Sequence, residues 1–260
     1  KCDMATAVGP NRYPTLLYNA MIHPIVGFPV TGVIWYQGES NAGRAMQYRT
    51  AFPLMIRDWR KQWKSELPFY FVQLANFGAS GGTSGNGGSE WAELRESQAA
   101  TLRLPNTGMA VIIDIGESKD IHPRNKQDVG KRLAANALAN TYRKKMEYTG
   151  PVFKSMKIEG NKAILSFDHA AELEVRPASD LVNGFEIAGA DQRFYQATAR
   201  IEGNRIVVSA PEVTKPAAVR YAWADDPQNL NLYNKAGFPA APFRTDTWKA
   251  RTEGVKFSFE

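Results

Sequence analysis

A carboxylate, a histidine and a proline stand together at residues 120–123. Asp120 lies two positions before His122, and Pro123 follows the histidine directly. An imidazole changes protonation near neutral pH, and a carboxylate beside it fixes its tautomer and stabilises the protonated ring. Pro123 also restricts the backbone of His122. The pattern is typical of the general-base half of a hydrolase, with His122 as the base and Asp120 as its partner.

Other residues compete for these two roles. Asp114 and Glu117 are carboxylates in the same loop as His122. His23 is a weaker candidate for the base because its segment has no strand pattern, and His169 is weaker because it stands at an expected turn. A purely structural histidine remains the alternative reading of His122.

A second polar cluster follows the apolar run at residues 30–36. It comprises Gln37, Gly38, Glu39, Ser40 and Asn41. The amides of Gln37 and Asn41 are donors suited to an oxyanion, and Gly38 permits a close approach of the backbone to a ligand. Glu39 is suited to orienting a donor or a sugar hydroxyl. The alternative is that Ser40 and Asn41 only cap the next helix.

Alternating strand and helix patterns position both clusters. Apolar runs predict buried strands at residues 30–36, 69–74 and 109–114, and apolar spacings of three and four predict helices at 48–63, 91–102 and 126–146. This alternation predicts an α/β fold with parallel strands and crossover helices. Such sheets bind ligands beyond the carboxyl ends of their strands, which is where both clusters stand.

The second half of the chain has a different pattern. Two Gly-Asn turns, at Gly160 and Gly203, separate short alternating runs and predict β-hairpins. We therefore expect an α/β domain at residues 1–149, a small antiparallel β domain at 150–228, and a tail at 229–260 that packs back on the first domain. The glycine-rich run at 78–88 predicts either a plain surface loop or a mobile lid over the site.

Composition limits the classes of function. The chain has 260 residues, of which 43% are hydrophobic, and a formal charge of +6. Its basic residues are scattered among acidic ones, so we expect no nucleic-acid partner. No apolar run reaches the roughly 18 residues of a membrane span, and no signal peptide is visible. With Cys2 as the single cysteine, three separated histidines and no phosphate-binding loop, we expect neither a metal nor a cofactor.

Four motifs together resemble the sialate O-acetylesterase family within the SGNH hydrolases. They are the run from Val33 to Asn41 (VIWYQGESN), the run from Trp91 to Gln98 (WAELRESQ), the run from Asp120 to Gly130 (DIHPRNKQDVG), and the tail from Asn231 to Arg244. The resemblance covers nearly the whole chain. It implies a flavodoxin-like hydrolase domain that removes O-acetyl groups from sugars without a cofactor.

The resemblance also assigns roles to residues. His122 matches the catalytic histidine and Asp120 its acidic partner, while Gln37 and Gly38 match the block that stabilises the oxyanion and contacts sugar. The commoner SGNH pattern places the acid three positions before the histidine, where this chain has Lys119. A serine–histidine dyad helped by a backbone carbonyl is therefore the alternative to a triad.

The chain departs from the family at the nucleophile. The family's serine lies in a GQSNM block upstream of the QGES block, and no such block is present. Ser40 belongs by position to the later block, so it is a weak candidate. We therefore expect the carboxyl-terminal portion of a longer esterase, with the serine on an N-terminal fragment and the fold incomplete at its N-terminus.

The expected substrate is sialic acid acetylated at its 9-position, or a related acetylated glycan. An acetylxylan-type esterase is the close alternative, and the resemblance suggests a secreted or periplasmic protein. An alternative from another class is a catalytically silent carbohydrate-binding or scaffold chain. It would stack sugars on aromatic side chains such as Trp223 and Tyr233.

Overall fold

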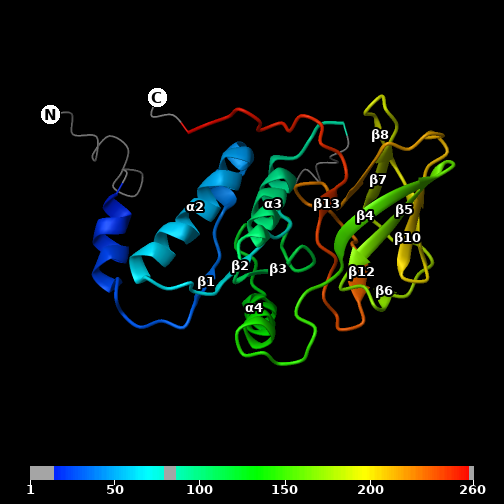
Figure 1. The fold of residues 1–260 in the computed structure, drawn as a ribbon. Coiled ribbons are helices and arrows are strands. Elements are labelled where there is room, and N and C mark those ends of the chain that lie inside the picture. The colour runs from blue at the N-terminus through cyan, green and yellow to red at the C-terminus, as the bar shows by residue number, and fades with distance from the viewer. Residues whose placement is uncertain (1–14, 79–85, 258–260) are drawn as a thin grey trace.

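A parallel sheet forms the centre of the first half of the chain (Figure 1). The computed structural model describes residues 15–78 and 86–257. The sheet has the order β1-β2-β3, with β1 at Val33–Trp35, β2 at Phe69–Val72 and β3 at Thr107–Ala110. The register pairs Val33 with Phe69 and Phe69 with Thr107. The expected α/β class with parallel strands is confirmed.

Helices cover both faces of this sheet. Helices α2 (Ala45–Trp63) and α3 (Glu90–Ala100) pack on the face that carries Phe69 and Phe71, and α4 (Lys126–Asn140) packs on the face that carries Tyr70 and Val72. Alternate residues of β2 thus face different helices, which explains why all four are buried.

The prediction of a buried first strand is wrong for one of its faces. Val33 and Trp35 pack towards the α2 side, but Ile34 is 70% exposed. The reason is that β1 ends the sheet, and α4 contacts mainly β2 and β3. Within the described residues, no strand pairs with the outer edge of β1.

The helix predicted at residues 126–146 is too long. Helix α4 ends at Asn140, and the amides of Tyr142 and Lys144 then bond to the carbonyls of Ala137 and Leu138. Arg143 takes a left-handed φ of 56°. No glycine or proline marks this stop, so the continuing sequence pattern did not reveal it.

Antiparallel strands form the rest of the molecule, and both Gly-Asn hairpins are confirmed. Gly160 and Gly203 turn the chain with φ of 59° and 65°. One sheet has the order β4-β5-β10-β9, the second has the order β13-β11-β7-β8, and β12 pairs with β6. Their bounds are β4 Val152–Glu159, β5 Lys162–Asp168, β6 Leu173–Val175, β7 Phe185–Ala188, β8 Phe194–Gln196, β9 Thr198–Glu202, β10 Arg205–Ser209, β11 Ala218–Tyr221, β12 Leu232–Asn234 and β13 Phe243–Arg244.

The tail contacts both halves of the molecule. Strands β12 and β13 pair within the β unit, opposite β6 and β11. Further on, the backbone amides of Arg251 and Thr252 donate to the carboxylate of Glu93 on α3, at 2.6 and 2.9 Å. The division at residues 149 and 228 stays a prediction. No helix in the described ranges is long and apolar enough to cross a membrane.

The core between α2 and the sheet gives a first prediction. Phe52 is 2% exposed, and its ring centroid lies 5.1 Å from that of Phe71. Phe52→Ala should lower the free energy of unfolding by about 3–5 kcal/mol, because it removes buried surface and leaves a cavity. Leu54→Ala, on the same helix but 60% exposed, is the control. Urea unfolding followed by circular dichroism measures both, and equal losses would contradict this packing.

Candidate functional site

The two polar clusters predicted from the sequence both lie beyond the carboxyl ends of strands of the parallel sheet. The run that begins at Gln37 follows β1, and the loop that carries His122 follows β3. One contact joins the segments next to the clusters: the ammonium of Lys126 lies 4.8 Å from the ring centroid of Tyr36. Tyr36 directly follows β1, and Lys126 begins α4 four residues after His122.

Asp120 is the carboxylate that lies beside His122. Its Oδ1 accepts the backbone amide of His122 at 2.8 Å and lies 3.8 Å from Nδ1 of the imidazole. The side chain of His122 is 87% exposed. The ring is therefore held near a carboxylate on one side and is open to a reacting group on the other.

The competing carboxylates are engaged elsewhere. Asp114 accepts two hydrogen bonds from the guanidinium of Arg132, at 2.6 and 2.8 Å, and one from the hydroxyl of Tyr233. Burial and the neighbouring Asp114 raise the pKa of Tyr233 to about 12, so that hydroxyl stays a donor. Glu117 accepts the backbone amide of Arg124 at 2.7 Å. Asp114 thus has a structural partner, which leaves Asp120 for His122.

A polar relay fixes the orientation of Asn41. The hydroxyl of Tyr48 donates to Oε1 of Gln37 at 3.1 Å, and Nε2 of Gln37 donates to Oδ1 of Asn41 at 3.2 Å. Because its oxygen accepts this bond, Asn41 must present its NH₂ group in the other direction. Burial, with a smaller contribution from the charge of Glu39, raises the pKa of Tyr48 to about 12 and keeps the hydroxyl protonated.

The capping alternative for this cluster is wrong. The short 3-10 helix η4 (Glu39–Arg44) and helix α2 both begin without a side-chain cap. Gly38 has φ of 156°, and a Cβ there would lie 3.1 Å from Nε2 of Gln98. Ser40 is exposed, and no hydrogen bond joins it to His122 in the described part of the chain.

Two residues of α3 support this edge, and functional reasoning from the sequence missed both. Gln98 accepts the amide of Leu74 and donates to the carbonyl of Gln37, at 2.9 and 3.3 Å. Arg95 is fully buried and donates to backbone carbonyls after β2 and in the segment 224–225. Burial lowers the pKa of Arg95 to about 9, against the nearby Asp225 and Asp226, so the guanidinium is charged at neutral pH. The sequence offered one signal for Arg95: a charged residue at a position of α3 that faces the core.

The segment 224–228 reaches the loop of His122 through a chain of contacts. Nδ2 of Asn76 donates to Asp226 at 2.9 Å, and Oδ1 of Asn76 accepts the amide of Gly116 at 2.8 Å. Nε2 of Gln228 donates to the hydroxyl of Ser118 at 3.2 Å. The β unit therefore holds the loop that carries Asp120 and His122.

The remaining candidates lie away from this edge or outside the described residues. His23 lies in the short 3-10 helix η3 (His23–Ile25), and Nδ1 of His169 lies 3.3 Å from Glu147. Cys2 and most of the predicted lid, residues 79–85, lie outside the described residues. Among residues 15–78 and 86–257, no group of three His, Cys, Asp or Glu side chains is placed to hold a metal ion.

The aromatic residues predicted to stack on sugar are not open platforms. Trp223 is 3% exposed, and the guanidinium carbons of Arg220 and Arg244 lie 5.4 and 5.3 Å from its ring centroid. Tyr233 is half-buried and bonds to Asp114. This argues against a binding function that depends on these two faces.

Comparisons with known proteins agree on one group. The model of the family described as carbohydrate esterase, sialic acid-specific acetylesterase, matches residues 8–139. The sialate O-acetylesterase of Mus musculus is 31% identical over 270 residues, which cover 90% of this chain and 48% of that protein. The human sialate O-acetylesterase is 31% identical, over 92% of this chain and 50% of that protein.

A solved structure gives the same result. A carbohydrate acetylesterase from Xanthomonas citri superposes with a TM-score of 0.87 and is 54% identical in sequence. The match covers 92% of this chain and 55% of the Xanthomonas chain. This chain thus spans about half the length of the relatives that it matches.

The different partners of Asp114 and Asp120 give a second prediction. Asp114→Asn should lower the free energy of unfolding by about 3 kcal/mol, because it leaves the guanidinium of Arg132 largely buried without its counter-charge. Asp120→Asn should change it by no more than about 0.5 kcal/mol, since Asp120 lies in an exposed loop. Urea unfolding of the two matched variants measures the difference. A larger loss at Asp120 would reverse the assignment.

Proposed function

Because the chain belongs to the sialic acid-specific acetylesterase family of carbohydrate esterases, we propose that it carries the acid–base and oxyanion half of a sugar O-acetylesterase. The observation that carries the proposal is the pairing of His122 with Asp120 at the edge of the sheet where Asn41 presents its amide. Glu39 stands in the same run and is a candidate contact for a sugar hydroxyl.

The proposed chemistry proceeds in two steps through an acyl-enzyme. His122 takes the proton of a serine hydroxyl, and the serine oxygen attacks the acetyl carbonyl. The NH₂ group of Asn41 and donors at Gln37 and Gly38 hold the oxyanion. His122 returns the proton to the sugar oxygen as the C–O bond breaks. Water, deprotonated by His122, then attacks the acetyl-serine. The bond between the acetyl carbon and the serine oxygen breaks, acetate leaves, and His122 returns its proton to the serine oxygen. Asp120 stabilises the imidazolium in both steps.

The serine is proposed to come from a segment that adds to β1. Ile34 on β1 is 70% exposed, and Phe28 and Met21, which precede it, are 67% and 63% exposed. A strand edge that pairs with no strand of the described residues and has apolar neighbours is a surface that another strand would cover. A strand added there parallel to β1 would deliver its carboxyl end beside Gln37. An N-terminal fragment carrying the serine is therefore the proposed partner.

The substrate class follows from the family. A 9-O-acetylated sialic acid, or a related acetylated glycan, is the proposed substrate, and the net charge of +6 suits an anionic sugar. Acetylated plant polysaccharide, as in an acetylxylan-type esterase, is the second candidate. Because such glycans lie outside the cell, the proposed location is secreted or periplasmic. The alternative is a carbohydrate-binding chain without catalytic activity. It is favoured by the absence of a hydrogen bond between Ser40 and His122, both of which are described residues.

Acetate release tests this proposal. The chain is joined to the part of the Xanthomonas citri esterase that it does not cover, and acetate is measured with acetylated sialic acid and acetylated xylan. His122→Ala should lower kcat by about 100-fold or more, the range of general-base catalysis. His169→Ala, at a histidine that lies away from both this edge and the proposed partner surface, is the control and should keep the activity. Equal activity of His122→Ala and the parent protein would contradict the proposal.

Asn41 gives a separate test. Asn41→Ala should lower kcat by about 100-fold, because the missing donor acts on the charge that develops in the transition state. KM should change little, since the ground-state carbonyl depends less on this donor. A change confined to KM would make Asn41 a sugar-binding residue instead.

A further inference from the structure

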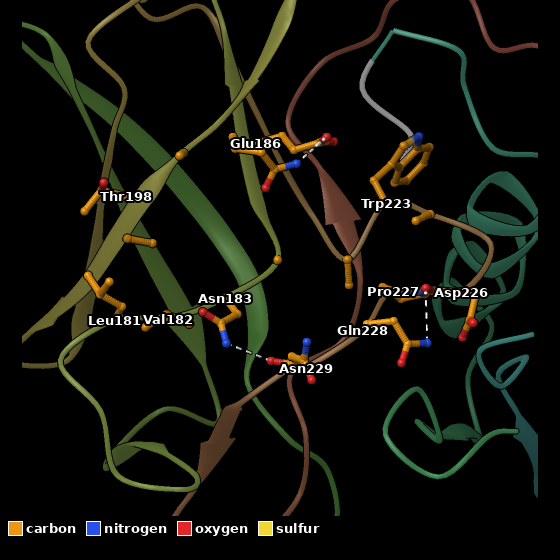
Figure 2. A pocket seen from close by; sticks show the side chains of 16 residues that line it. Leu181, Val182, Asn183, Glu186, Thr198, Trp223, Asp226, Pro227, Gln228 and Asn229 are labelled. Carbon is orange, nitrogen blue, oxygen red and sulfur yellow. Dashed lines mark hydrogen bonds between the residues drawn. The ribbon is translucent and has the colours of Figure 1, made fainter. Parts of the chain in front are cut away.

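We propose that a cavity in the β unit is a second sugar subsite, which holds an uncharged sugar unit next to the acetylated one. The cavity has a volume of about 480 Å³ and lies between β7, β8, β9 and the segment 222–229 (Figure 2). This volume falls in the range of small-molecule sites, about 300–1,000 Å³. The inference rests on the proposed esterase function and extends it to the rest of the glycan.

The wall of the cavity suits hydroxyl groups. Side-chain amides of Asn183 and Asn229 and the hydroxyl of Thr198 lie on its lining. The amide of Asn229 and the hydroxyl of Thr198 bond to no other described side chain or backbone group, so they are open to a ligand. Leu181 and Pro227 supply an apolar part of the lining. Hydrogen-bonding groups beside an apolar surface match the two kinds of surface on a pyranose ring.

The charge of the cavity selects against an acidic sugar. Its lining contains the carboxylates Glu186 and Asp226, which are 8% and 4% exposed, and no lysine or arginine. Glu186 accepts from Gln196 at 3.1 Å, and Asp226 accepts from Asn76 at 2.9 Å. The nearest cations lie outside the lining: Arg95, close to Asp226, donates to backbone carbonyls, and Arg220, opposite Glu186 in the sheet, pairs with Asp246. A ligand carboxylate here would therefore meet carboxylate oxygens and no cationic donor, whereas neutral hydroxyls can donate to them.

The position of the cavity ties it to the candidate catalytic loop. The segment that forms one wall of the cavity carries Gln228 (Figure 2). Nε2 of Gln228 donates to the hydroxyl of Ser118, four residues before His122, so this wall is bonded to the candidate catalytic loop. Asn76 bridges Asp226 to Gly116 in the same region. A glycan whose acetylated unit lies at His122 can therefore extend over this segment into the cavity.

Binding of unacetylated sugars tests the subsite. The 260-residue chain is titrated calorimetrically with xylotetraose and with N-acetylneuraminic acid. Xylotetraose should bind, and any binding of N-acetylneuraminic acid that depends on Asn229 should be at least about tenfold weaker, a difference of about 1.4 kcal/mol. Asn229→Gly should weaken xylotetraose binding about fivefold, the effect of one or two neutral hydrogen bonds. Thr198→Val, which removes the hydroxyl and keeps the shape, should weaken it too.

Gln192→Gly is the matched control. Asn229 and Gln192 both have a left-handed φ, of 56° and 63°, so glycine suits either backbone, but Gln192 lies outside the cavity. The control should bind xylotetraose as the parent does. The subsite is overturned if xylotetraose does not bind, or if both cavity variants bind it as tightly as the control. Its preference for a neutral sugar is overturned if N-acetylneuraminic acid binds as well as xylotetraose and Asn229→Gly weakens that binding too, because sialic acid bound at the catalytic edge would not depend on Asn229. Because binding needs no acetate release, lost catalysis with retained binding would overturn only the esterase proposal.

Discussion

The buried guanidinium of Arg95 is the interaction on which the geometry of this edge depends. It donates to four backbone carbonyls, those of Leu74, Ala75, Ala224 and Asp225, at 2.6 to 2.9 Å. A buried charge is stable only when it is partnered, and here backbone from the α/β half and from the β unit supplies the partners. Neither segment can move away without leaving a buried charge unsatisfied, so Arg95 couples the two halves.

This coupling explains how distant segments shape one site. The segment held by Arg95 carries Asp226 and Gln228, which bond to Asn76 and to Ser118. Through these bonds the β unit supports the loop of His122. Gln98 supports the run of Gln37 and Asn41 by donating to the backbone carbonyl of Gln37. Asp114, held by Arg132, anchors the start of the same loop. The exposed residues that are proposed to act in catalysis are thus held in position by buried residues that have no proposed catalytic role.

Periodicity predicted the parallel strands, the crossover helices and both hairpins, because those depend on local apolar patterns. It did not predict the exposed Ile34, because the coverage of a strand depends on its place in the sheet. It also missed the end of α4, where no glycine or proline marks the stop. The candidate residues His122, Asp120 and Asn41 were named from the sequence. The roles of Asp120 and Asp114 could be distinguished only from their contacts in the structure, with His122 and Arg132 respectively. Arg95 was missed because its partners are backbone carbonyls from distant segments, which no sequence pattern shows.

The most direct measurement is to find which serine a fluorophosphonate labels, since this reagent modifies activated serine hydroxyls. The chain joined to the uncovered part of the Xanthomonas citri esterase is labelled and mapped by peptide mass spectrometry, beside its His122→Ala variant. We expect one labelled serine in the added part, with labelling lost in the variant and none on Ser40. A label on Ser40 in the 260-residue chain alone would contradict a nucleophile supplied at the β1 edge.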